Sequence, residues 1–391
     1  MKVAVLLALP LAFAVAEGQS APPKADPAAG DDSVLRGMEA GLEELRDGRL
    51  DEAARRLDSV LNVIESQWAD TESARRVRSL WYSEGAKAFR GEPYERVSAY
   101  FYRGVIHLLK GEYDDARVAF KAGTLQDAFA EEEQYRCDWG LLYYLYATCS
   151  EAMGAEDLAR QAIQEALEVP GRPWHYTSPP PKPPLNVLLV ETGRAPRKLA
   201  DGAGHSALVY RRGTGFRDEG VEVTCEAGRR RYRSVATEDL FFQASTRGGR
   251  AVDRIVEGKV QFQKGLDRTG ERAGALAGSA DLVAVITGSN KLGALGGAID
   301  LIGGISRLVA ANAKPRVDTR QWASLPDRIH VVFLPASDSC SRVRIRYLDY
   351  QGESVPGLDR EAVLDETRRK AGVIVHYVPS PTALWKEGGV Q

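Results

Sequence analysis

The sequence predicts an α+β protein in which all-α helical hairpins precede an antiparallel β domain that carries a Gly/Ala-rich helical insertion. Helix-period patterns fill residues 33–169, where small residues recur at fixed offsets. Apolar and polar residues alternate in short segments after residue 186. Prolines crowd residues 170–185, between the two patterns. We therefore expect a helical domain over 33–169, a stiff linker over 170–185 and a β domain over 186–391.

One spacing of small and apolar residues occurs three times in the helical half, with steps of seven, five, four and three residues. The first copy is Gly41, Gly48, Ala53, Leu57 and Val60, the second is Gly104, Gly111, Ala116, Phe120 and Gly123, and the third is Ala147, Gly154, Ala159, Ile163 and Ala166. This spacing is typical of tetratricopeptide repeats, in which the two helices of a hairpin touch at small residues. It predicts a surface that binds other proteins, and an ordinary bundle with coincidental glycines is the alternative.

The spacing also predicts where the helices pair. The expected hairpins are 33–47 with 50–66, 93–109 with 112–126, and 131–152 with 155–168. Gly48, Gly111 and Gly154 lie where a first helix must end and the chain must reverse. The copies begin 63 and 43 residues apart instead of the usual ~34, so the array is irregular and an extra helix is expected at about 72–90.

Aromatic residues are concentrated in the helical half, and most of them should form its core. The consecutive rings at 143, 144 and 146 cannot all face inward on one helix, because neighbouring positions differ by about 100°. We therefore expect some rings to line a groove that binds a protein or peptide. The predicted anchors are Tyr102, Tyr143, Tyr144 and Tyr146.

Period-two patterns predict strands in the β domain. They lie at 187–191, 207–211, 221–225, 328–334, 342–348 and 373–378, with a helical insertion at about 237–313. Gaps between the strands before the insertion are too short for crossover helices, so an antiparallel arrangement is expected. Charged residues interrupt the apolar part of the insertion, and no transmembrane segment is expected. Its small residues predict packing on the sheet, with an interfacial membrane helix as the alternative.

Three arginines alternate with apolar residues on one predicted strand. Arg342, Arg344 and Arg346 would share one face of it, and a second basic cluster lies at 229–233. Guanidinium groups bind carboxylates and phosphates through two hydrogen bonds at once, so these residues could bind an anionic cell-wall polymer. A solvated outer face of a half-buried strand is the alternative interpretation.

Residues 1–16 have the pattern of a secretory signal peptide. Lys2 precedes an apolar stretch, and Ala14, Val15 and Ala16 form a small-x-small cleavage site. We expect cleavage near Ala16, a disordered linker over 17–32, and an exported protein that is periplasmic or secreted. The cysteine nearest to this segment is Cys137, so a lipid anchor on an N-terminal cysteine is not expected.

Four cysteines in an exported chain permit disulfides. Cys225 and Cys340 both lie in strand-like segments, and either a bond between them or two buried free thiols fits the sequence. Cys137 and Cys149 are twelve residues apart, which on one continuous helix is about 18 Å and too far for a bond.

The chain carries no recognisable catalytic, metal or cofactor motif. None of its five histidines has a second histidine or a cysteine at metal-ligand spacing. Residues 204–208 resemble half of a nucleophile elbow but lack the closing glycine. The net charge of -2 gives no basic excess, and no nucleic-acid partner is expected. We predict a non-enzymatic scaffold or adaptor, with a cryptic hydrolase as an alternative, and the oligomeric state stays open.

Three stretches together resemble a known group of proteins. They are residues 91–118, 190–198 and 317–326, the last containing Asp318, Arg320, Trp322 and Pro326. In these stretches the chain resembles uncharacterised bacterial envelope lipoproteins with N-terminal tetratricopeptide repeats. The resemblance implies a loose association with cell-envelope assembly and no established activity.

The stretch from Asp318 to Pro326 is the most specific part of this resemblance. It reads as a connector between a helix and a strand, because Pro326 bars continuation of a helix. Trp322 would plug the interface between elements, and Asp318 would pair locally with Arg320. A ligand site on this connector, with Trp322 as a binding residue, is the alternative.

Overall fold

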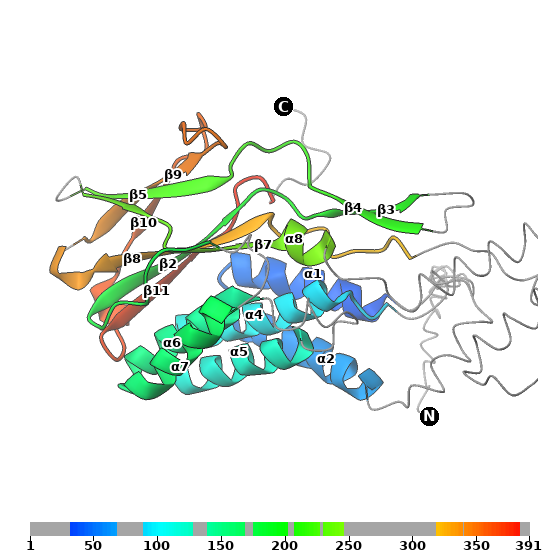
Figure 1. Cartoon of the computed structure of the whole chain (residues 1–391), viewed down its shortest axis with the longest axis horizontal. Coiled ribbons are helices and arrows are strands. Elements are labelled where there is room, and N and C mark those ends of the chain that lie inside the picture. The colour runs from blue at the N-terminus through cyan, green and yellow to red at the C-terminus, as the bar shows by residue number, and fades with distance from the viewer. Residues whose placement is uncertain are drawn as a thin grey trace, which may run out of the picture.

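Three layers make up the part of the chain that a computed structural model describes. The described residues are 32–68, 89–127, 139–168, 175–201, 207–226, 230–245, 318–338 and 340–383. One layer is helical, and two sheets are stacked beside it, with β2, β8 and β11 between the helices and β5, β9 and β10 (Figure 1). The protein is therefore a mixed α+β structure, as predicted. The predicted signal peptide, residues 72–88 of the expected extra helix and most of the helical insertion lie outside the described residues.

Six helices form the three hairpins that the sequence predicts. They are α1 (Ser33–Arg46) with α2 (Leu50–Trp68), α4 (Pro93–Lys110) with α5 (Tyr113–Asp127), and α6 (Gly140–Ala152) with α7 (Glu156–Glu168). The chain reverses at Gly48, Gly111 and Gly154, whose φ angles are 77°, 69° and 73°. A residue with a side chain adopts this left-handed conformation at a cost, which explains the glycine at each turn.

The recurring small residues hold the two helices of each hairpin together. A Cβ added to Gly104 would lie 2.4 Å from the Phe120 ring, and one added to Gly41 would lie 3.0 Å from Leu57. Ala147 packs in the same way in the cluster to which Ile163 contributes. Each pair joins the first and fourth positions of the repeated spacing, so the predicted packing of the hairpins is confirmed.

The inner sheet lies next to the helices and has the strand order β1-β7-β8-β2-β11. Its strands are β1 (His175–Tyr176), β7 (Ala236–Asp239), β8 (Arg328–Pro335), β2 (Leu185–Thr192) and β11 (Val373–Val378). The predicted antiparallel arrangement is wrong for one pair, because β11 runs parallel to β2. The gaps that favoured antiparallel pairing join successive strands, whereas the entire outer sheet lies between β2 and β11 in the sequence.

The outer sheet is antiparallel and has the order β10-β9-β5-β6. Its strands are β10 (Arg360–Val363), β9 (Arg342–Leu348), β5 (Gly220–Cys225) and β6 (Arg231–Arg233), and a separate hairpin joins β3 (Arg197–Asp201) to β4 (Ala207–Arg211). The start of the predicted helical insertion is corrected, because Ala236–Asp239 forms β7 and the helix α8 (Leu240–Ser245) begins only after it.

The inner sheet is buried on both faces, which joins the three layers. Val187 and Leu189 of β2 point into the core shared with the helices, whereas Leu188 and Val190 point into the core shared with the outer sheet. The helical part and the inner sheet thus share one continuous core. The segment that was expected to be a linker is attached to the fold at two points, since β1 pairs with β7 and the Tyr144 hydroxyl donates to the carbonyl of Ser178 at 2.9 Å.

None of the helices in the described ranges combines the length and the apolar character that crossing a membrane requires.

Candidate functional site

The inner sheet covers the helix face on which the peptide groove was expected. Tyr102 and Tyr144, two of the four predicted anchors, are fully buried against it. The Tyr102 hydroxyl donates to Glu191 Oε1 of β2 at 2.5 Å, and the Tyr144 ring lies 6.0 Å from the Phe333 ring of β8. These two side chains therefore pack between layers and do not line an open groove. Local sequence patterns do not predict this burial, because both partners come from strands far along the chain.

Glu191 is the polar centre of this buried interface. It accepts hydrogen bonds from Tyr102, from Arg46 of α1 at 2.9 Å and from the backbone N–H of Ser380 at 3.3 Å. The Glu191 side chain is fully buried, and Arg46 is 5% exposed. Burial, together with the nearby Glu191 charge, raises the pKa of the Tyr102 hydroxyl well above its usual range, so this group stays a hydrogen-bond donor.

Trp322 lies inside the interface, as the connector interpretation predicts. Its indole ring is fully buried, with its centre 5.7 Å from that of Tyr102. Its backbone N–H donates to Glu95 Oε1 at 2.6 Å, and its ring N–H donates to Ser324 at 2.9 Å. Because no part of the side chain reaches solvent, Trp322 holds the layers together and is not placed to meet a ligand.

Local pairing fixes the connector beside Trp322. Arg320 contacts Asp318 at 2.7 Å and Asp32, just before α1, at 2.5 Å. Lys198 of β3, which is almost fully buried, contacts Glu92 at 2.8 Å. The predicted pairing of Asp318 with Arg320 is therefore confirmed. The buried partners of these charges were invisible in the sequence because they come from distant segments.

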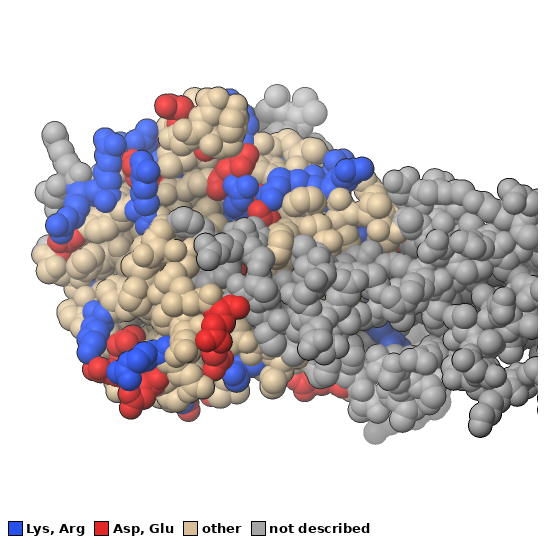
Figure 2. All heavy atoms as spheres, viewed as in Figure 1, with Lys and Arg blue, Asp and Glu red and all other residues tan. Residues whose placement is uncertain are grey.

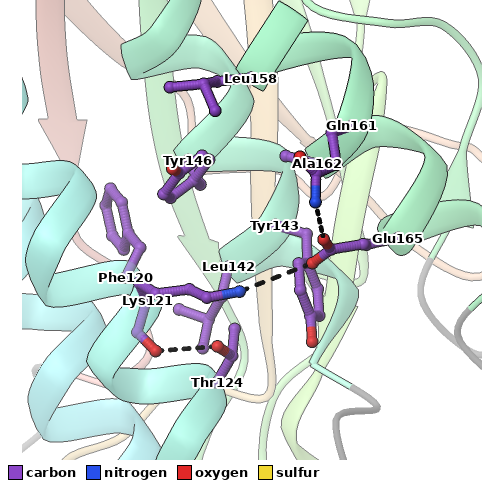
Figure 3. A pocket seen from close by; sticks show the side chains of 10 residues that line it. All are labelled: Phe120, Lys121, Thr124, Leu142, Tyr143, Tyr146, Leu158, Gln161, Ala162 and Glu165. Atoms are coloured by element: carbon purple, nitrogen blue, oxygen red, sulfur yellow. Dashed lines mark hydrogen bonds and ion pairs between the residues drawn. The ribbon is translucent and has the colours of Figure 1, made fainter.

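A small pocket opens between the helices of the second and third hairpins and contains the other two predicted anchors. We call it the tyrosine pocket; it has a volume of about 190 Å³ and is lined by Phe120, Lys121, Thr124, Leu142, Tyr143, Tyr146, Leu158, Gln161, Ala162 and Glu165. In Figure 3, Lys121 extends from α5 toward Glu165 of α7, and their charged groups lie 3.7 Å apart. The Gln161 amide also donates to Glu165, at 3.1 Å. Tyr143 and Tyr146 are thus accessible, unlike Tyr102 and Tyr144.

Five arginines cover the solvent side of the outer sheet. We call this surface the arginine face; its arginines are Arg231 and Arg233 of β6 and Arg342, Arg344 and Arg346 of β9. The intervening residues of β9, Val343, Ile345 and Tyr347, are fully buried. The predicted alternation of β9 is therefore confirmed. In Figure 2, Lys and Arg atoms gather at the end of the molecule where β5 and β9 lie.

Carboxylates on the arginine face orient its arginines without neutralising them. Glu222 of β5, only 5% exposed, contacts Arg346 at 3.2 Å and also reaches Arg231 and Arg233 at 3.8 and 3.9 Å. Glu361 lies 3.3 Å from Arg342 and 3.6 Å from Arg344, and Glu226 lies 3.8 Å from Arg342. Three carboxylates therefore face five guanidinium groups, which leaves a positive surface. Arg229 of the predicted second cluster lies outside the described residues, and Arg230 pairs with Asp338 at 2.8 Å.

A buried charge network lies where β7 and β8 meet the end of β4. Asp327, fully buried, contacts Arg212, and Arg212 also contacts Asp239 at 2.6 Å. Burial raises the pKa of the Asp327 carboxyl to about 6, although Arg212 opposes the shift. One oxygen of Asp327 has no hydrogen-bond partner.

Histidines offer little chemistry in the described residues. His330 is buried between the sheets, with the hydroxyls of Thr192 and Thr237 each 3.0 Å from one ring nitrogen.

His107, Glu112 and Asp115 form the one group in the described ranges whose ligand atoms, all within 4.8 Å of one another, could hold a metal ion. His107 and Glu112 already share a 2.7 Å hydrogen bond. A group of one histidine and two carboxylates lacks the histidine and cysteine spacing by which metal sites are recognised in a sequence. Residues 204–206 of the half nucleophile elbow lie outside the described residues.

A disulfide joins the end of β5 to the segment just before β9. Cys225 and Cys340, 115 residues apart in sequence, are bonded and their Cα atoms lie 5.6 Å apart. Of the two alternatives that the sequence left open, the structure therefore has the bond. Cys149 is a buried free cysteine, and burial raises the pKa of its thiol. Cys137 lies outside the described residues.

Comparisons with family models, curated proteins and solved structures give no match to this chain.

Proposed function

We propose that this protein is an exported, non-enzymatic adaptor that binds an anionic polymer of the cell envelope through its arginine face. The supporting observation is the exposed surface with five arginines and three carboxylates on the outer sheet. Guanidinium groups on one flat face can each donate two hydrogen bonds to phosphate or carboxylate groups of a polymer. This was the second interpretation of the sequence, and the burial of Tyr102 and Tyr144 favours it over a peptide groove on the inner helix face.

The helical hairpins have a supporting role in this proposal. We infer that they are irregular tetratricopeptide-type repeats whose inner face is filled by the chain's own sheet. The shared core and the buried contacts of Glu191 support this inference. A platform held this way keeps the arginine face on the opposite side of the molecule open.

The disulfide supports the proposed export. Bonds such as Cys225–Cys340 form and persist in oxidising compartments and are rare in the cytosol. Together with the signal-peptide pattern in residues 1–16, it favours a periplasmic or secreted protein. The resemblance to bacterial envelope lipoproteins fits the same location.

The arginine face is tested by binding to defined polymers. The immobilised protein is titrated with polyphosphate, alginate and neutral dextran, and binding is expected for the two anionic polymers only. An Arg342→Ser, Arg344→Ser and Arg346→Ser variant should lose roughly 10- to 100-fold in affinity, since three ionic contacts worth about 0.5–1 kcal/mol each are removed. Raising the salt concentration should weaken binding of the unchanged protein.

A matched variant separates the arginine face from net charge. Arg49, Arg55 and Arg160 are exposed arginines of the helical layer, with side chains 50%, 71% and 73% exposed. Their replacement by serine removes the same charge from another surface and should leave polymer binding unchanged. Equal losses in the two triple variants would show that only net charge matters, and the proposal would be wrong.

A further inference from the structure

We propose that the tyrosine pocket is a second binding site, which accepts one bulky apolar side chain from a lysine- or arginine-rich peptide segment of a partner protein. This goes beyond the polymer-binding function, because the pocket belongs to the helical layer and the arginine face belongs to the outer sheet. The protein would then bind a polymer with one layer and a protein with another.

The size of the pocket selects the kind of ligand. Sites for drug-sized molecules usually measure about 300–1,000 Å³, so a pocket of about 190 Å³ is too small for such a ligand. It suits a single large side chain, which is how peptides anchor themselves on protein surfaces. The volume thus favours a peptide over a metabolite.

The walls of the pocket favour an apolar anchor. Phe120, Leu142, Tyr143 and Tyr146 contribute aromatic and aliphatic surface, and Leu158, 40% exposed, lies at the rim (Figure 3). A side chain that enters would remove this surface from water, which is the main source of affinity in such contacts.

Charges around the pocket select the residues that flank the anchor. The helices α5, α6 and α7 carry eight carboxylates and three cationic side chains, a net charge of -5. Lys182 pairs with Glu156 and reduces this to -4. Glu165 lies in the pocket wall itself, where Lys121, one of these three cations, pairs with it at 3.7 Å. A segment with lysines or arginines beside its apolar residue therefore complements the surface, whereas an acidic segment would be repelled.

The test uses labelled peptides and fluorescence polarisation with the purified full chain. The probe is a twelve-residue peptide with one central phenylalanine among lysines and serines. One comparison peptide has alanine in place of phenylalanine, and another has glutamates in place of the lysines. We expect the first peptide to bind at least tenfold more tightly than either comparison peptide. Equal binding of the alanine peptide would overturn the proposal, because the pocket would then contribute nothing.

The chain offers closely matched variants on α7. Gln161 lines the pocket and Gln164 does not, yet both are exposed and both donate to a glutamate four residues later. Gln161→Trp should block the pocket and lower the affinity at least tenfold, whereas Gln164→Trp should leave it within about twofold of the unchanged protein. The same contrast is expected for Glu165→Gln and Glu168→Gln, with a smaller loss of about threefold. Equal effects within either pair would overturn the proposal.

Two further outcomes would also reject the proposal that the tyrosine pocket binds a partner's peptide. Light scattering could give a dimer that Gln161→Trp dissociates, in which case a second copy of the chain fills the pocket. The triple arginine variant could lose peptide binding while Gln161→Trp keeps it, in which case the peptide binds elsewhere. Polymer binding by the Gln161→Trp variant is expected to remain intact, so failure of this proposal can be distinguished from failure of the polymer-binding function.

Discussion

The hydroxyl of Tyr102 on α4 donates a 2.5 Å hydrogen bond to Glu191 on β2, 89 residues further along the chain. Arg46 of α1 contacts the other carboxylate oxygen of Glu191 at 2.9 Å. One buried carboxylate thus joins two helices of different hairpins to β2 of the inner sheet. Through it, the helical face that could have bound a peptide is fixed against the chain's own sheet.

This relationship predicts an order of stability losses. Tyr102→Phe should lower the free energy of unfolding by about 1–3 kcal/mol, since it removes one bond to a buried charge. Glu191→Gln should cost more, about 3–5 kcal/mol, because Arg46 then stays buried without its anionic partner. Urea unfolding monitored by circular dichroism measures both. Tyr350→Phe is the control, since Tyr350 is 77% exposed, and it should change stability little. Losses below about 0.5 kcal/mol in both buried variants would contradict the coupling of the layers.

Local patterns in the sequence were sufficient for some elements and not for others. The segments predicted as strands are found as β2, β4, β5, β8, β9 and β11. The strands β1, β6, β7 and β10 have two to four residues, too few for alternation to be recognised. The repeated glycines predicted the hairpins because their contact lies within about 16 residues, as for Gly104 and Phe120.

The candidate sites likewise include some residues whose placement local patterns predict and others whose placement depends on distant segments. The shared face of Arg342, Arg344 and Arg346 follows from strand geometry alone, so the sequence predicted it. Helix geometry predicted that the rings at 143, 144 and 146 could not all face inward, but it did not say which one would, and Tyr144 was wrongly named as an anchor. The burial of Tyr102 depends on a strand that joins the fold from far along the chain, and no local period contains this information.

The Cys225–Cys340 bond predicts a redox-sensitive stability. Reduction should lower the free energy of unfolding by about 2–5 kcal/mol, since the bond closes a loop of 115 residues that is unconstrained when reduced. Urea unfolding with and without dithiothreitol measures this difference. A Cys225→Ser and Cys340→Ser double variant should show the lower stability in both conditions. Labelling of the denatured, unreduced protein should detect two thiols, and four would contradict the bond.

Because burial raises the pKa of Asp327, we expect its contribution to the free energy of unfolding to fall as the pH rises. Its pKa is about 6 in the folded protein and 3.8 in the unfolded chain, so the folded state binds more protons between these values. The favourable contribution of the protonated carboxyl is present below about pH 4 and is lost as the pH rises through 6. The unfolding free energy of the unchanged protein, relative to that of Asp327→Asn, should therefore fall by about 2–3 kcal/mol from pH 4 to pH 7. A constant difference over this range would contradict the assignment. Asp359→Asn, at an exposed carboxylate, corrects for the removed charge.

Gly104 and Phe120 predict a pair of compensating substitutions in the second hairpin. Gly104→Ala should lower the free energy of unfolding by about 1–3 kcal/mol, since the new methyl group would lie 2.4 Å from the Phe120 ring and force the helices apart. Phe120→Leu alone should also cost about 1–3 kcal/mol, because it leaves space in the same contact. The double variant should cost less than the sum of the two, since the smaller side chain makes room for the methyl group.

Gly154→Ala is the comparison, because nothing lies within 4 Å of its added Cβ and only its φ of 73° is strained. Its cost should be about 1 kcal/mol and should add to that of Phe120→Leu without compensation, as expected for a turn in another hairpin.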